Sequence, residues 1–160
     1  MSPKEYHEIN QGEFGTHRDG LILETVGIGP CIGVAIGFRK KAFLLHDDAQ
    51  GGLSAKFEEF LEVVAREIPE QDRPSVRPVL VGTALESYLQ EEASTHEESL
   101  LIRKAAVAAL QRLGFGESHK FWGLTKAQKP TDSQDVLIDV ANRTITVDPV
   151  KGEKHQVSYQ

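Results

Sequence analysis

The architecture of this chain follows from one run of residues: Cys31-Ile32-Gly33-Val34-Ala35-Ile36-Gly37-Phe38, the polar Arg39-Lys40-Lys41, and then Ala42-Phe43-Leu44-Leu45-His46. Two short apolar runs on either side of a polar turn are typical of a β-hairpin buried in a protein core. Glycines at positions 33 and 37 indicate that another segment approaches the first strand closely, because glycine otherwise weakens a strand. The sequence therefore predicts an antiparallel pair of strands over residues 31–46.

The segments on either side of this hairpin show strand and helix patterns in turn. Residues 21–26, 79–81, 136–140 and 144–147 have strand patterns, and residues 53–68 carry apolar side chains at helical spacing until Pro69 ends the helix. A second helix is expected from Thr95, where Thr95-His96-Glu97-Glu98 has the form of a capping box, with Gly114 as its C-terminal cap. Residues 99–113 are apolar on most faces, which predicts a well-buried helix.

This order of elements predicts an α/β or α+β layered sandwich, in which a mixed β-sheet core is covered by two main helices. Residues 20–150 form a single domain on this interpretation. Residues 1–19 are polar and are expected to be a loose N-terminal arm or an edge segment, and residues 151–160 a polar C-terminal tail that is ordered only if it docks. The aromatic cluster in residues 119–122 is interpreted as a packed surface anchor.

Composition excludes several classes of function. The 160 residues carry a net charge of −6 and no basic run, which argues against binding to a nucleic-acid backbone. No apolar run is long enough to cross a membrane, and no apolar segment follows Met1, so neither a membrane span nor a secretory signal is expected. One cysteine forbids an internal disulfide and is compatible with a reducing compartment, so a cytoplasmic location is the expectation.

Metal and phosphate motifs are also missing from the sequence. The histidines outside the hairpin form no His-x-x-x-His unit, and the chain has no Cys-x-x-Cys unit, so no metal site and no cofactor are expected. The glycines at positions 27 and 29 lack the third glycine and the lysine of a phosphate-binding loop.

The single cysteine, Cys31, is the candidate nucleophile. It follows the glycine-rich turn Gly27-Ile28-Gly29-Pro30, and the backbone of that turn, at Gly29 and Pro30, is placed to hold a developing oxyanion. A lone cysteine can equally be a small apolar filler of the core. Cys31 can act as a nucleophile only if a basic side chain reaches its sulfur, whereas a core cysteine needs no such neighbour.

His46 is the candidate base, because a hairpin with its turn at residues 39–41 brings it to the same edge as Cys31. A histidine in this place would favour the thiolate and then protonate a leaving group. Such a histidine needs a third group to set its tautomer. Thr25, at the end of the preceding strand, is one candidate; Asp47 is the other, although adjacent residues of a strand point to opposite faces.

These residues resemble the chemoreceptor glutamine deamidase (CheD-like) family in the pattern Thr25-x-Gly27-x-Gly29-Pro30-Cys31, His46 and Gly51-Gly52. Weaker similarity continues at Leu80-Val81-Gly82-Thr83-Ala84 and at residues 98–114 and 144–148. The cytotoxic necrotizing factor type of toxin deamidase shares the same pair of residue types. The resemblance implies Cys31 as the nucleophile, His46 as the acid and base, and Thr25 as the group that orients His46.

The function that the resemblance implies is hydrolysis of a glutamine side-chain amide in a target protein, giving glutamate and ammonia through a Cys31 thioester, without a cofactor. The expected partner is a protein with an exposed glutamine, in the cytoplasm or, for an effector, in a host cytoplasm. Two alternatives stay open. The chain is a non-catalytic protein-binding module with Cys31 merely buried, or it is a transglutaminase that passes the same acyl-enzyme to an amine.

Overall fold

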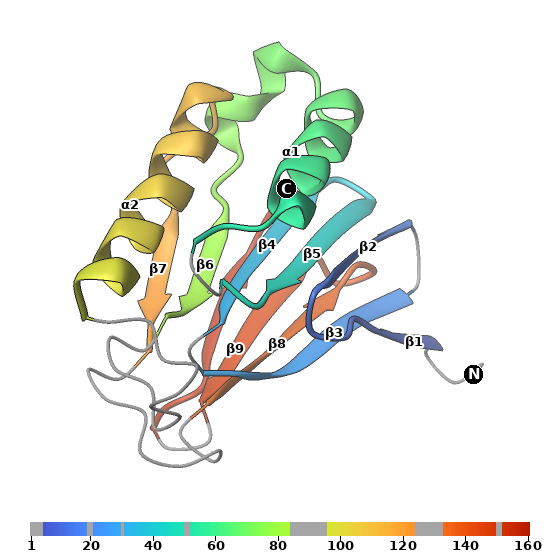
Figure 1. Ribbon diagram of the computed structural model, residues 1–160. Helices are drawn as coiled ribbons and strands as arrows, with labels where there is room; N and C mark the ends of the chain where they lie inside the picture. Colours follow the sequence, from blue (N-terminus) through green and yellow to red (C-terminus); the bar gives the residue numbers. More distant parts are fainter. Residues whose placement is uncertain are drawn as a thin grey trace.

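The computed structural model describes residues 5–18, 21–29, 31–49, 52–83, 96–123, 133–149 and 152–160. The fold is an α+β sandwich of three layers (Figure 1). One sheet has the order β2-β5-β4-β6-β7 and is called the β4 sheet here; the other has the order β1-β3-β8-β9-β10 and is called the β3 sheet. The two long helices, α1 and α2, cover the face of the β4 sheet that points away from the β3 sheet. The sequence prediction of a layered sandwich with two main helices is therefore confirmed, with two sheets in its core.

The β4 sheet is built around the predicted hairpin. Strand β4 (Ile32–Phe38) pairs antiparallel with β5 (Lys41–Asp47), and β6 (Val79–Gly82) lies on the other side of β4. Side chains alternate along β4: the even positions from Ile32 to Phe38 pack under the helices, whereas positions 33, 35 and 37 face the β3 sheet. A Cβ atom at Gly37 would lie 2.4 Å from the ring of Tyr159, so this glycine makes room for the opposing sheet as the sequence predicts.

The β3 sheet uses strands from both halves of the chain. Strand β3 (Leu21–Ile28) pairs antiparallel with β8 (Gln134–Asp139), and β8 pairs with β9 (Thr144–Pro149). Both sheets contribute apolar side chains to the space between them, among them Leu23, Leu44, Val81 and Ile138. This inter-sheet core is separate from the second core, which lies between the β4 sheet and the helices.

The N-terminal residues form edge strands, the second of the two alternatives that the sequence left open, and not a loose arm. Strand β1 (Glu5–Glu8) pairs parallel with β3, and β2 (Glu13–Arg18) pairs antiparallel with β5, so the segment supplies an edge strand to each sheet. The C-terminal residues likewise dock, because β10 (His155–Ser158) pairs with β9. An edge strand is exposed to water along one side, so its residues can be polar. A search of the sequence for apolar runs therefore does not detect these strands. The two sheets consequently extend beyond residues 20–150 at both ends.

The helices follow the predicted spacing with one difference. Helix α1 (Ala55–Glu67) begins after Ser54, whose side chain accepts a hydrogen bond from the Lys56 N–H, and ends at Ile68 before Pro69. Helix α2 (His96–Arg112) buries Ile102, Ala106 and Leu110. Its other face leaves Leu100 and Leu101 exposed, at 42% and 64%, so the expectation of a well-buried helix holds for one face only. The capping threonine predicted at position 95 lies outside the described residues.

Two further elements complete the β4 sheet and its helical layer. A short 3-10 helix, η1 (Glu70–Ser75), follows α1. Strand β7 (His119–Trp122) pairs parallel with β6 at the edge of the sheet, where the sequence predicted only a surface anchor. None of the helices in the described ranges has the length and apolar character that crossing a membrane requires.

Candidate active site

The three candidate residues come from three different strands or turns and meet in the inter-sheet core. Thr25 lies in β3, His46 lies in β5, and Cys31 immediately precedes β4. The side chains of all three are buried, with exposures of 0% for Thr25, 2% for His46 and 5% for Cys31. His46 shares its face of β5 with Ala42 and Leu44, and Cys31 belongs to the same inter-sheet cluster. The structure therefore brings the candidate nucleophile and base to one face of one sheet.

A chain of hydrogen bonds sets the tautomer of His46. The Thr25 hydroxyl lies 2.7 Å from His46 Nδ1 and donates its proton to the Ile9 carbonyl, also at 2.7 Å. Because a hydroxyl has only one proton, the Thr25 oxygen must accept from the Nδ1–H of the neutral imidazole. The lone pair of the ring is then on Nε2, which is buried and has no hydrogen-bond partner among the described residues. This is the tautomer that a histidine needs to remove a proton from a thiol.

The backbone holds His46 from both sides. In the ladder of the β4 sheet, His46 stands between Glu13 of β2 and Gly33 of β4. The Gly12 N–H donates to the His46 carbonyl at 2.7 Å. The ring therefore projects from a strand that has neighbours on both edges, which restricts its movement.

Cys31 is a diagonal neighbour of His46, because Gly33, two residues further along, stands directly opposite His46. The Cα atoms of diagonal neighbours in an antiparallel pair lie about 7–8 Å apart, a distance that an aromatic side chain can span. No hydrogen bond joins the Cys31 sulfur to His46 in the described part of the chain. The Cys31 carbonyl is fixed by the Thr83 N–H at 2.7 Å, so a side-chain rotation, and not a backbone shift, is the movement that would close the gap.

The protonation states of the pair differ from the sequence expectation. Burial, together with the negative charges of Asp48 and Asp47, raises the pKa of the Cys31 thiol to about 12. Burial lowers the pKa of His46, against the opposing effect of the same two carboxylates. The expectation that the histidine favours the thiolate is therefore wrong for the resting site. Here a neutral thiol lies near a neutral imidazole.

The raised thiol pKa predicts a pH dependence of stability. The ordinary pKa of 9.0 applies to the unfolded chain and the value of about 12 to the folded chain, so above pH 9 the unfolded state loses its proton first. The stabilisation is complete below pH 9 and is lost as the pH rises toward 12. We expect the free energy of unfolding in urea to fall less steeply above about pH 9 in Cys31→Ala than in the native chain. Parallel curves for the two proteins would contradict this.

Asp47, the alternative partner for His46, has another role. Its carboxylate accepts hydrogen bonds from the Ala49 N–H at 2.9 Å and from the Ser54 N–H at 3.0 Å, and also from the Ser54 hydroxyl. Asp47 thus fixes the loop that leads into α1. Adjacent strand residues point to opposite faces, which is why Asp47 serves the helix side while His46 serves the inter-sheet side.

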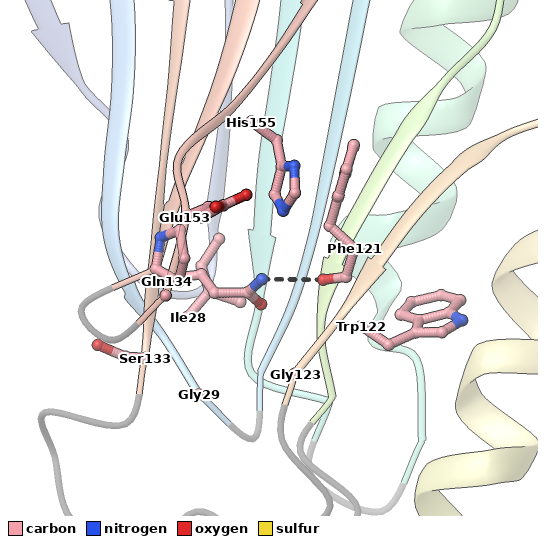
Figure 2. A pocket seen from close by; sticks show the side chains of 11 residues that line it. Ile28, Gly29, Phe121, Trp122, Gly123, Ser133, Gln134, Glu153 and His155 are labelled. Atoms are coloured by element: carbon pink, nitrogen blue, oxygen red, sulfur yellow. Dashed lines mark hydrogen bonds between the residues drawn. The ribbon is translucent and has the colours of Figure 1, made fainter.

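The predicted oxyanion turn is only partly available. Gly29 is buried, whereas Pro30 lies outside the described residues and, being proline, has no N–H to donate. The donors that remain in this turn are the N–H groups of Gly29 and Cys31. Beside the turn is a cavity of about 230 Å³ that Ile28 and Gly29 line on one side (Figure 2).

Sequence analysis missed Gln134, which joins the walls of this cavity. Its side-chain amide donates to the Phe121 carbonyl at 3.0 Å (Figure 2). It also accepts a hydrogen bond from the Gly82 N–H, at 3.0 Å. The amide thus bridges the backbones of β6 and β7 at the end of their ladder, where Gly82 pairs with Trp122. A single glutamine at the start of a strand gives no signal in a sequence. Only the pairing of the strands shows this role.

Thr25→Val tests the hydrogen-bonded chain. Valine keeps the shape of threonine but removes the hydroxyl, leaving the Ile9 carbonyl and His46 Nδ1 buried without their partner. We expect a loss of about 1–3 kcal/mol in the free energy of unfolding and a mixture of the two His46 tautomers in ¹⁵N NMR spectra. Thr25→Ser keeps the hydroxyl and should preserve a single tautomer. A valine variant with an unchanged His46 spectrum would show that Thr25 does not set the ring.

The described ranges contain no group of three or more histidine, cysteine, aspartate or glutamate side chains placed to hold a metal ion. No protein-family model matches this chain, and no curated protein matches it.

Proposed function

We propose that this chain is a cysteine-dependent amidohydrolase that converts a glutamine side chain of a target protein to glutamate. One observation carries the proposal: the Ile9 carbonyl, the Thr25 hydroxyl and His46 Nδ1 form a buried chain that leaves the Nε2 lone pair unpartnered, on the face of the sheet that also holds the only thiol. A buried ring nitrogen without a partner is costly in a core and is typical of a site kept ready for proton transfer.

In the proposed mechanism the neutral pair reacts when substrate arrives. The Cys31 S–H gives its proton to His46 Nε2 as the sulfur attacks the carboxamide carbon, so the thiolate forms only in the transition state. The N–H groups of Gly29 and Cys31 hold the developing oxyanion. Thr25 accepts the Nδ1–H throughout, and the carboxylates of Asp47 and Asp48 favour the imidazolium that forms.

The second half of the reaction restores the enzyme. The imidazolium gives its proton to the departing nitrogen, the C–N bond breaks, and ammonia leaves a thioester on Cys31. Water then attacks the thioester as Nε2 takes one of its protons, and this proton returns to the sulfur when the C–S bond breaks. The target gains a negative charge where it had a neutral amide, a change that can switch a protein surface.

The experiment is to incubate the full chain with glutamine-containing folded proteins and peptides and to measure ammonia and the mass of the products. The proposal expects ammonia together with glutamate at specific positions. A parallel reaction with added methylamine separates the transglutaminase alternative, because incorporation of the amine without net hydrolysis would assign the acyl transfer to an amine acceptor. No ammonia and no incorporation would overturn both activities.

A non-catalytic binding module is the second candidate, and the protonation state of Cys31 favours it. A thiol that is 5% exposed and has a pKa of about 12 behaves like a core residue. Alkylation with iodoacetamide separates the two functions. A catalytic site predicts labelling of the native protein that slows in His46→Ala, whereas a binding module predicts labelling only on unfolding.

A further inference from the structure

A second cavity lies at the opposite end of β4 from Cys31. Its volume is about 750 Å³, and it opens where the turns of the two sheets meet. Arg39 comes from the β4–β5 turn, Arg77 precedes β6, Arg143 comes from the β8–β9 turn, and Tyr159 follows β10. Residues from four separate parts of the chain thus converge on one hollow.

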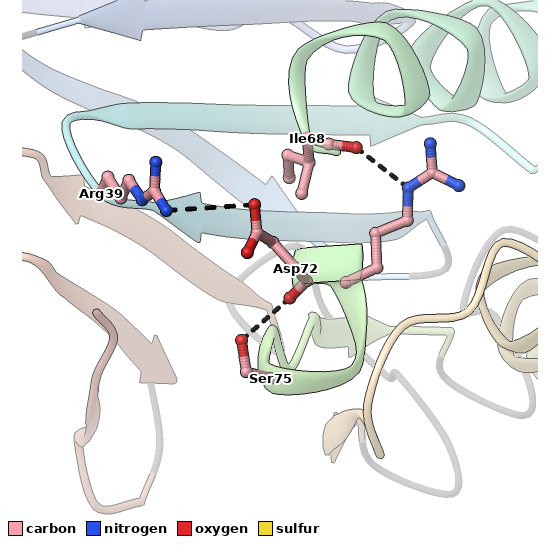
Figure 3. Close-up of polar contacts among 5 residues, drawn as sticks. Arg39, Ile68, Asp72 and Ser75 are labelled. Atoms are coloured by element: carbon pink, nitrogen blue, oxygen red, sulfur yellow. Dashed lines mark hydrogen bonds and ion pairs between the residues drawn. The ribbon is translucent and has the colours of Figure 1, made fainter. Parts of the chain in front are cut away.

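The charge of this cavity is opposite to that of the chain. Its lining side chains include three guanidinium groups and one carboxylate, that of Asp72, in a protein with a net charge of −6; Gln160, the last residue of the sequence, also lines it. Arg39 and Asp72 form an exposed ion pair at 3.9 Å, and Ser75 donates to the backbone carbonyl of Asp72 (Figure 3). This pair accounts for one of the three cations. Arg77 and Arg143 form no ion pair within the described ranges, although the carboxylate of Glu117 acts on His119 together with Arg77, and that of Asp139 acts on Tyr159 together with Arg143.

The cavity also holds hydrogen-bond donors without acceptors. The Tyr159 hydroxyl oxygen is buried and has no hydrogen-bond partner among the described residues, and its ring is packed against Gly37. Burial raises the pKa of Tyr159 to about 12, so the hydroxyl remains a donor at neutral pH. The Arg143 side chain likewise has no hydrogen-bond partner in the described part of the chain, whereas Arg77 uses only its Nε–H, on the Glu117 carbonyl. Because the Tyr159 hydroxyl is shielded from solvent, the donors that an occupant of the cavity can reach are the guanidinium groups.

We propose that this cavity binds the phosphoryl group of a small anionic molecule, held by Arg77 and Arg143. Donors that converge from separate turns suit a tetrahedral group with several oxygens, and arginine binds such oxygens through more than one N–H at once. His119 also lines the cavity, but burial and the nearby Arg77 lower its pKa, so it adds no charge at neutral pH. The site is separate from the Cys31 site, and its test does not depend on the proposed deamidase activity.

The test is calorimetric titration of the full chain with orthophosphate and with pyrophosphate. We expect pyrophosphate to bind, with an affinity that falls as salt rises, and Arg143→Gln to weaken binding at least about tenfold. Arg112→Gln, at the exposed end of α2, is the matched control and should bind as the native chain does. No binding of either anion, equal binding by the Arg143 variant, or tighter binding of malonate than of pyrophosphate would each overturn the phosphoryl assignment.

Discussion

Replacement of Cys31 by alanine is expected to reduce ammonia release from a glutamine-bearing protein to the uncatalysed background, a loss of about 10⁴-fold or more. The sulfur is the atom that attacks the amide in the proposed reaction, and the chain has no second thiol to replace it. His46→Ala should cause a loss of the same order, because a thiol with a pKa of about 12 cannot react at neutral pH without a base. The two losses should not add, since the residues act as one unit.

Stability must be measured alongside, so that loss of activity is not confused with loss of structure. Cys31 is small and buried in the inter-sheet core, and its truncation should cost only about 1 kcal/mol. Cys31→Ser is the matched variant, because it keeps the size of the side chain and replaces the nucleophile with a much weaker one. Ammonia release that continues unchanged in a folded Cys31→Ala protein would contradict the proposed enzyme activity. It would leave the phosphoryl site unaffected, because that site is tested separately by titration with pyrophosphate.

Gly82→Ala is expected to destabilise the fold by about 3–5 kcal/mol. Gly82 ends β6 with φ at +90°, a conformation that other residues rarely adopt. A Cβ atom there would lie 2.3 Å from the carbonyl oxygen of Cys31 and 2.4 Å from Ile28 Cγ2. The backbone before β4 would have to move, and the Thr83 N–H would lose its hold on the Cys31 carbonyl. The variant should therefore unfold at lower urea and lose activity even when it is folded.

Gly114→Ala provides the matched control. Gly114 has φ at +91°, almost the same as Gly82, but nothing lies within 4 Å of the place where its Cβ atom would be. Its substitution should cost only the left-handed backbone penalty, about 1–2 kcal/mol. The difference between the two variants in urea unfolding isolates the steric contact with the Cys31 turn. Equal costs would mean that this contact does not constrain the turn.

The hairpin and the helices could be predicted because their signals are local. The sequence predicted a turn at residues 39–41, but the turn is Arg39-Lys40 alone, because Phe38 pairs with Lys41. This register places Cys31 and His46 on one face, whereas a three-residue turn would shift the pairing by one residue and separate them. The alternation of side chains along the strand separates Asp47 from His46. In α1, the apolar spacing and the proline after Ile68 fix the buried face and the end of the helix.

The rest depends on contacts between distant segments. The edge strands β1, β2 and β10 are polar, and only pairing with β3, β5 and β9 defines them. The thiol pKa could not be predicted because it depends on how completely the second sheet covers Cys31. Gln134 and Tyr159 are single residues whose roles depend on partners, or on their absence, elsewhere in the fold.

The N-terminal strands have a practical consequence for anyone who trims this protein. A fragment beginning at residue 20 would keep Cys31, His46 and Thr25, yet it would lack the Ile9 carbonyl that takes the threonine proton and the Gly12 N–H that holds the His46 backbone. The His46 imidazole of such a fragment would interconvert between its two neutral tautomers. The shortened protein would then lack the proposed activity even if it stayed folded. Tags and cleavage sites are better placed ahead of Glu5 than within the segment that joins β1 to β2.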